Sequence, residues 1–573
     1  MTNNNNGSSI SSGGSGIHKT RPKNLDSDAE DSTRSEKKPV VYVEDPPTPP
    51  RWLSYEFIFY YIIIVIGYFV VLKMLITRSN EYNDGSKENK GIVDGWFLSR
   101  KQDLSDTQYK IYRQNFPLLS IGLSIFLLVS ASIRKNFPDK PYVRILFYNI
   151  ISLGFLIFVH GSSTFIVLGI AIINFGISRV FERSKMLPAI TWIFNLIILW
   201  TCYIYEGYSF KTLSPFLGDE LSFWLDEHKG FLSWETYFKV SMLRFISYNN
   251  DYYWAKSKRP VVDLKGKSAY FIAQERHQPM EHYSFSHFLA YIFYIPLYIA
   301  GPITTFNAFT AQVYNPQKTY SFSDLVKASI KILLVFLGLE IALHYCYYHS
   351  FDKSDVWMTF TGAEVALTGY LVLNFMYVKF LIIWRTFRLF ALFDGIDTPE
   401  NMNRCVNNNY TFTGFWRSWH GAFNKWTIRY LYIPLGGKKT QFVSIWIIFF
   451  FIGLWHDLWL SWIAWALLNC VFFSIEIGIM FYFYHPKRLP LRRKWYWRFM
   501  VAIAGTFNIF LLMVANLAIL HGFENSIIFI HNAFFVPGGP TAFILAYSWL
   551  FCGIMVMIEI RESEKRSKEV KPF

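Results

Sequence analysis

The sequence predicts an all-α polytopic membrane protein. More than half of its 573 residues are apolar and a fifth are aromatic. Only 17% are charged, whereas soluble chains carry about a quarter. The apolar residues gather in long runs, and a helix needs about 20 such residues to cross a bilayer. We count about eleven hydrophobic segments and no internal repeat.

The first apolar run, at residues 57–76, is unbroken and long enough to span a bilayer. Residues 1–51 before it are rich in Asn, Ser and Gly and then in proline, so we expect a disordered tail. The N-terminus lacks the pattern of a cleavable signal peptide. The first run is therefore expected to direct membrane insertion, and a polar connection, 77–115, follows it.

The remaining apolar segments lie at 116–133, 145–159, 164–181, 187–205, 325–347, 365–393, 458–483, 500–520 and 542–560. Residues 208–248 mix aromatic and charged side chains, which predicts interfacial helices along the headgroups. Residues 251–283 are polar and predict a long loop. The segment 285–309 contains Pro296 and Gly301-Pro302, which predict a broken or re-entrant helix beside a cavity.

The formal net charge is +15. Residues 1–54 contain seven basic and seven acidic side chains, so the excess belongs to the membrane part. There it indicates loops on a cytoplasmic leaflet or a pocket for an anionic substrate. The basic residues form no cluster on a soluble module, which argues against nucleic-acid binding. A charged tail, 562–573, ends the chain.

The five cysteines are scattered and show no metal-ligand spacing. Four of them lie in apolar runs and are expected to be buried and reduced. Their numbers are Cys202, Cys346, Cys470 and Cys552, and the fifth is Cys405.

The signature stretch, residues 415–457, places two histidines in or beside apolar segments. Ionisable groups at membrane depth are costly and normally face a cavity or a partner, which indicates a functional site. Trp416, His420 and Asn424 follow an i, i+4, i+8 spacing and share one face if this piece is helical. A turn at 434–437 precedes the apolar run that ends at His456. Two imidazoles on neighbouring elements suit a buried proton transfer.

This stretch resembles the signature of the membrane-bound O-acyltransferase (MBOAT) superfamily. The motifs are Trp416-Arg-Ser-Trp-His420, Arg429-Tyr-Leu-Tyr-Ile-Pro-Leu-Gly-Gly437 and Leu454-Trp-His456-Asp457. Asp394-Gly-Ile-Asp-Thr-Pro-Glu400, Arg404-Cys405-Val406 and Ala300-Gly-Pro-Ile-Thr-Thr-Phe306 are similar to the yeast glycerol-uptake-protein branch, a relative of hedgehog acyltransferase. The resemblance begins near Trp52 and implies a catalytic domain over 52–561. It also implies tilted and re-entrant helices around a buried chamber that a tunnel joins to the cytosol.

The resemblance implies an enzyme of the endoplasmic reticulum membrane that moves a long or very long acyl chain from acyl-CoA to a lipid hydroxyl. In the yeast branch the implied acceptor is the lyso form of a glycosylphosphatidylinositol (GPI) anchor, at the sn-2 position of its lyso-phosphatidylinositol part. Membrane lipids, acyl-CoA and lyso-GPI lipid or GPI-anchored proteins are the implied partners. His456 is the implied general base, since an imidazole with a pKa near ~6.5 accepts a proton at neutral pH. His420 stands where other branches more often carry Asn or Asp.

Residues beside the two histidines are candidates for substrate contacts. Asn424 can donate a hydrogen bond to a developing oxyanion. Trp416, Trp455 and Asp457 flank the histidines in the motifs.

Four basic residues have either of two roles. They can bind phosphates of coenzyme A or of a headgroup, or they can simply reach the membrane surface. They are Arg385, Arg388, Lys438 and Lys439. Cys405 matches a haem-ligating cysteine of hedgehog acyltransferase, so it is either a haem ligand or a free thiol. An acyl-cysteine role is disfavoured because no base lies beside it in the sequence.

Two other functions remain open from the sequence. A proton-coupled glycerol transporter or transport regulator would also have many spans and buried histidines, although the chain lacks the repeat of many carriers. A protein acyltransferase of the hedgehog-acyltransferase type would use the same chemistry on a peptide acceptor.

Overall fold

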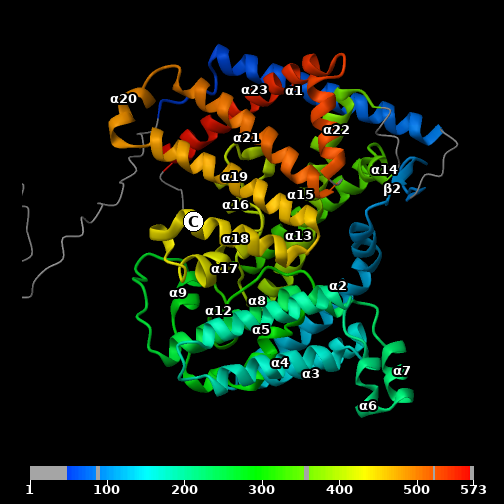
Figure 1. Cartoon of the computed structure of the whole chain (residues 1–573), viewed down its shortest axis with the longest axis vertical. Helices are drawn as coiled ribbons and strands as arrows, with labels where there is room; N and C mark the ends of the chain where they lie inside the picture. Colours follow the sequence, from blue (N-terminus) through cyan, green and yellow to red (C-terminus); the bar gives the residue numbers. More distant parts are fainter. Residues whose placement is uncertain (1–47, 85–90, 354–359, 521–522, 568–573) are drawn as a thin grey trace, which may run out of the picture.

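The structure is a computed structural model that describes residues 48–84, 91–353, 360–520 and 523–567. Nearly all of the predicted N-terminal tail and the last residues of the predicted C-terminal tail lie outside these ranges. The described residues form an all-helical bundle with one two-stranded hairpin (Figure 1). The predicted all-α class is therefore confirmed.

The elements follow the chain in two groups. The first comprises α1 Tyr55–Asp84, β1 Ile92–Asp94, β2 Lys101–Asp103, α2 Thr107–Asn136, α3 Tyr142–His160, α4 Thr164–Val180, α5 Leu187–Ile204, α6 Ser214–Leu217, α7 Asp219–Glu227, α8 Trp234–Lys256, α9 Ala269–Glu275, α10 Phe285–Ile292, α11 Ile295–Tyr298 and α12 Phe306–Tyr314. The second comprises α13 Phe322–Ala342, α14 Tyr348–Lys353, α15 Gly362–Phe393, α16 Phe412–Ser418, α17 Gly421–Thr427, α18 Gln441–His456, α19 Leu460–Phe483, α20 Leu489–Arg492, α21 Trp497–Leu520, α22 Phe523–Phe534 and α23 Gly539–Arg566. In Figure 1, α2–α5 lie at one end of the bundle, and α1 and α19–α23 lie at the other.

Within the described ranges, nine helices are long and apolar enough to cross a membrane. The predicted count of about eleven is not reproduced. Three predicted segments drop out: α4 has only 17 residues, segment 285–309 is broken, and α13 carries Lys327, Lys331 and Glu340 within its apolar stretch. Within the signature stretch, α18 is an additional span.

The prediction of interfacial helices over 208–248 is wrong for its second half. α8 occupies residues 234–256, and every residue from 241 to 252 is buried. It packs against α4, α5 and α12 in the largest hydrophobic core of the described residues. The sequence misleads here because polar side chains that face protein partners resemble polar side chains that face water.

The broken helix predicted over 285–309 is confirmed. α10 and α11 end at short interruptions, and α12 begins only at Phe306. Arg244 of α8 donates hydrogen bonds to the backbone oxygens of Ile292 and Leu297, 2.5 and 2.6 Å away. Because buried backbone oxygens need such partners, α8 makes this irregular backbone tolerable inside the protein.

The predicted loop over 251–283 is correct only in part, because α8 continues to Lys256 and α9 lies within the segment. Asp251 is fully buried and pairs with Arg429 at 3.2 Å. Arg429 also pairs with Glu275 of α9. Opposite charges buried together tie the signature stretch to the central helix, and removing one partner of such a pair is strongly destabilising.

Candidate active site

The chain bends sharply at His420. α16 ends at Ser418, α17 begins at Gly421, and His420 between them has a positive φ of 49°. Non-glycine residues rarely adopt this left-handed conformation. The prediction that Trp416, His420 and Asn424 share one face of a single helix is therefore wrong, although all three side chains reach the same cavity.

The predicted turn before α18 is confirmed. Gly436 and Gly437 have φ values of 107° and 60°, which glycine adopts without steric cost. α18 then runs from Gln441 to His456, so His456 is its last residue, as the apolar run predicted.

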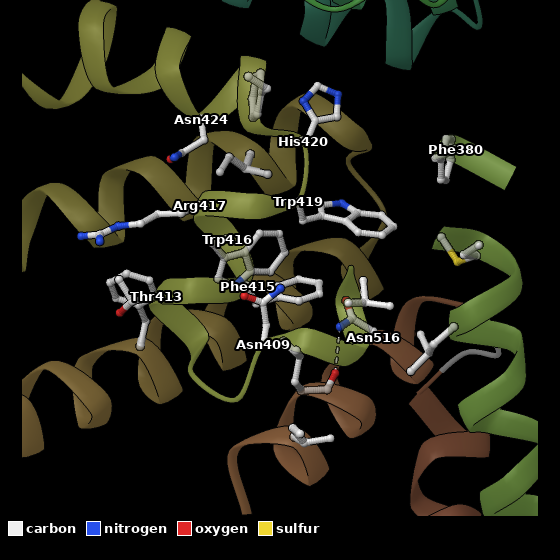
Figure 2. Close-up of a pocket in the computed structure, with 18 of the residues that line it drawn as sticks. Phe380, Asn409, Thr413, Phe415, Trp416, Arg417, Trp419, His420, Asn424 and Asn516 are labelled. Carbon is white, nitrogen blue, oxygen red and sulfur yellow. Dashed lines mark hydrogen bonds between the residues drawn. The ribbon is translucent and has the colours of Figure 1, made fainter. Parts of the chain in front are cut away.

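A cavity of about 1290 Å³ opens beside both histidines. Its walls come from α1, α8, α15–α19, α21 and α23, and most of its surface is apolar. Of the predicted site residues, those that line it are His420, His456, Asn424, Trp416, Trp455 and Lys438. Figure 2 shows a close-up of this cavity.

The imidazole of His456 is enclosed by tryptophans. It stacks on Trp462 with ring centroids 4.5 Å apart and meets the edges of Trp455 and Trp465 at 4.9 and 6.1 Å. Lys239 Nζ donates a hydrogen bond to the backbone oxygen of His456. Trp455 Nε1 donates in return to the backbone oxygen of Lys239 at 2.7 Å. A cation at the last turn complements the helix dipole, so α8 holds the end of α18 that carries His456.

His420 lies against Trp384 and Phe423, with ring centroids 4.5 and 5.2 Å apart, and its ring is 6.4 Å from that of Trp455. Both histidines thus adjoin Trp455. Burial lowers the pKa of His420 to about 4, so its imidazole is neutral at physiological pH. Within the described part of the chain, His420 Nδ1 has no hydrogen-bond partner.

Two predicted candidates lie apart from the histidine pair. Figure 2 shows the side chain of Asn424 directed away from the imidazole of His420. Asp457 accepts a hydrogen bond from the backbone of Leu458 and is absent from the cavity wall.

The two arginines are paired inside the protein. Arg388 forms an ion pair with Asp397 at 3.0 Å, and Arg385 pairs with Glu400 at 3.3 Å. Neither lines the cavity, and Lys439 does not line it either. Of the four basic residues, only Lys438 is placed to meet a substrate in this cavity.

Cys405 is exposed and is not among the residues lining the cavity, whereas the other four cysteines are buried as predicted. A haem needs an apolar slot beside its thiolate ligand, and the neighbouring Arg404 instead forms an ion pair with Glu564. The surroundings of Cys405 therefore do not fit a haem, and the mechanism below does not use one.

Sequence reasoning missed two sets of cavity residues. Lys239 lies in the segment that was predicted to be interfacial. The amides of Asn374, Asn409 and Asn516 also reach the cavity. An isolated polar residue within an apolar run is the signal that could have found them, because such residues normally face a cavity.

Comparison with known proteins identifies several relatives. The sequence profile of the "MBOAT, membrane-bound O-acyltransferase family" matches residues 218–520. The membrane-bound O-acyltransferases GUP1 of Saccharomyces cerevisiae and gup1 of Schizosaccharomyces pombe are each 33% identical to this chain. The alignments cover 90% and 89% of this chain and 93% and 89% of those proteins. The mouse protein-cysteine N-palmitoyltransferase HHAT is 29% identical over 47% of this chain and 56% of its own length.

Proposed function

The chain belongs to the membrane-bound O-acyltransferase family, and we propose that it transfers a long or very long acyl chain from acyl-CoA to lyso-GPI lipid. It is a multi-pass membrane acyltransferase. The proposal adds the donor, the acceptor and the endoplasmic reticulum membrane. The observation that carries it is the pair of histidines that adjoin one tryptophan in a largely apolar cavity.

In this proposal, His456 is the general base. Its imidazole takes the proton of the acceptor hydroxyl while the hydroxyl oxygen bonds to the carbonyl carbon of the thioester. The tetrahedral intermediate then collapses, the carbon–sulfur bond breaks, and the departing sulfur takes the proton back. No covalent enzyme intermediate is needed because the cavity is large enough to hold both substrates together.

His420 stabilises the oxyanion in this proposal. It is neutral, so one of its ring nitrogens carries a hydrogen that can be donated to the carbonyl oxygen of the thioester. The unpartnered Nδ1 supports this role, because a buried polar atom without a protein partner is available to a substrate. The apolar walls suit the acyl chain, and Lys438 is placed to meet an anionic group of the donor.

The test is acyl transfer from a radiolabelled very-long-chain acyl-CoA to lyso-GPI lipid by the purified full-length protein. We expect a labelled diacyl product whose label ester-hydrolysing base releases. A peptide product in its place would support the protein-acyltransferase alternative, to which the mouse relative's name points. Absence of product with lipid and peptide acceptors would contradict acyl transfer and would make glycerol flux in liposomes the next measurement.

Replacing Lys239 by methionine is expected to lower kcat by about tenfold or more with little change in KM. The reason is that a hydrogen bond from a charged donor holds the backbone at His456. Lys239→Arg keeps that donor and should recover much of the rate. Thr236→Ala, one turn earlier in α8 and on the cavity wall, is the matched control. A rate loss equal in Lys239→Arg and Lys239→Met, or a rise in KM alone, would contradict this positioning role.

A further inference from the structure

The half of the cavity away from the histidines carries a set of neutral amides. The amide wall consists of Asn374 of α15, Asn407 and Asn409 before α16, and Asn516 of α21, all of which line the cavity. In Figure 2, Asn409 and Asn516 lie on one side of Phe415 and Trp419, and His420 lies on the other. Two polar regions thus face one cavity, with aromatic rings between them.

The amides are held in place but keep free hydrogen-bonding capacity. Asn407 Nδ2 donates to Asn374 Oδ1 at 2.6 Å, and Asn409 Nδ2 donates to the backbone oxygen of Cys405 at 3.1 Å. Asn516 Nδ2 donates to the backbone oxygen of Leu512 at 2.8 Å. No described residue donates a hydrogen bond to the side-chain oxygen of Asn407 or Asn409. Each amide group is therefore oriented by one bond and can form others with a ligand.

Aromatic donors adjoin the amide wall. Trp416 Nε1 is buried and has no partner among the described residues, although its ring lines the cavity. Trp465 Nε1 donates to Asn516 Oδ1 at 3.4 Å. The ring of Trp465 is 5.5 Å from that of Trp416 and 6.1 Å from that of His456. A single tryptophan therefore joins the amide wall to the proposed base.

This chemistry matches a group rich in hydroxyls. A hydroxyl both donates and accepts, and so does a carboxamide, whereas a buried charged group would need an opposite charge. Aromatic rings beside the amides offer flat apolar faces to the carbon skeleton of a polyol ring. The four side chains of the amide wall are all uncharged, so they favour a polyol over a choline or amine headgroup.

We propose that the amide wall is the acceptor subsite and binds the hydroxyl-rich headgroup of the acceptor lipid, while the lipid's reacting hydroxyl reaches His456. This inference rests on the proposed acyl transfer and specifies which headgroup the cavity selects. Asn409 and Asn516 are its specificity-determining residues.

The test compares lyso-phosphatidylinositol with lyso-phosphatidylcholine of the same chain length, using full-length wild type, Asn409→Leu and Asn516→Leu. We expect wild type to prefer the inositol lipid. Each variant should raise KM for that lipid by about three- to tenfold, the effect of one neutral hydrogen bond. KM for acyl-CoA and for the choline lipid should not change. The matched control is Asn115→Leu, because Asn115 makes the same amide-to-backbone bond one turn back in exposed α2.

Binding is measured in parallel as the change in tryptophan fluorescence when each lysolipid is added without donor. Weaker binding of the inositol lipid in both variants, but not in the control, would support the subsite even if no transfer occurred, in which case only the proposed reaction would fail. Equal use of both lipids by wild type, or an equal loss for both lipids in the variants, would overturn the subsite while leaving acyl transfer standing.

Discussion

Replacing His456 by alanine is expected to lower kcat for acyl transfer by about two to four orders of magnitude, the contribution of a positioned general base. The loss should fall on kcat, because the substrates still enter the same cavity. The protein should remain folded, since the side chain only contacts neighbouring tryptophans at the end of α18. The measurement is single-turnover transfer from labelled acyl-CoA together with a thermal unfolding curve in detergent.

The control for this variant is His228→Ala. His228 also stacks on a tryptophan, Trp224, at a centroid distance of 4.1 Å, but it lies exposed at the end of α7. The control removes a similar ring contact far from the cavity and should keep full activity. A folded His456→Ala protein with wild-type kcat would rule out the proposed base.

Replacing His420 is expected to have the second largest effect. Loss of a donor to the oxyanion typically lowers kcat by about a hundredfold or more, so His420→Gly and His420→Ala should both be strongly impaired. The two variants differ in stability because residue 420 has a positive φ, which costs alanine roughly 1–2 kcal/mol but glycine almost nothing. Unfolding curves therefore separate the backbone effect from the chemical one.

His420→Asn provides the informative comparison. Asparagine tolerates the left-handed conformation and carries an amide donor, so it should retain more activity than alanine or glycine. Activity in His420→Gly equal to wild type would show that the imidazole itself is dispensable. An equally low rate in all three variants would indicate that the imidazole is needed for more than one hydrogen bond.

Local sequence signals predicted several structural features correctly. Proline and glycine predicted the interruption within 285–309 and the turn before α18, because these residues act on the backbone where they stand. The position of His456 at the end of an apolar run followed for the same reason. Long apolar runs also predicted most spans, since bilayer thickness sets a length that can be read directly.

Tertiary contacts decided what local patterns could not. The burial of α8 depends on partners far along the chain, such as Arg429 for Asp251. The bend at His420 is visible only in the folded backbone, and it replaced a predicted helix face by a shared cavity.

The sequence by itself determined the membrane class, the family and the two histidines, because composition and local motifs carry that information. Only the tertiary structure showed that the histidines adjoin one tryptophan, that Lys239 holds the end of α18, and that four distant asparagines line one cavity. The physical reason is that hydrogen bonds and ring contacts between segments hundreds of residues apart depend on packing, and no local spacing records them.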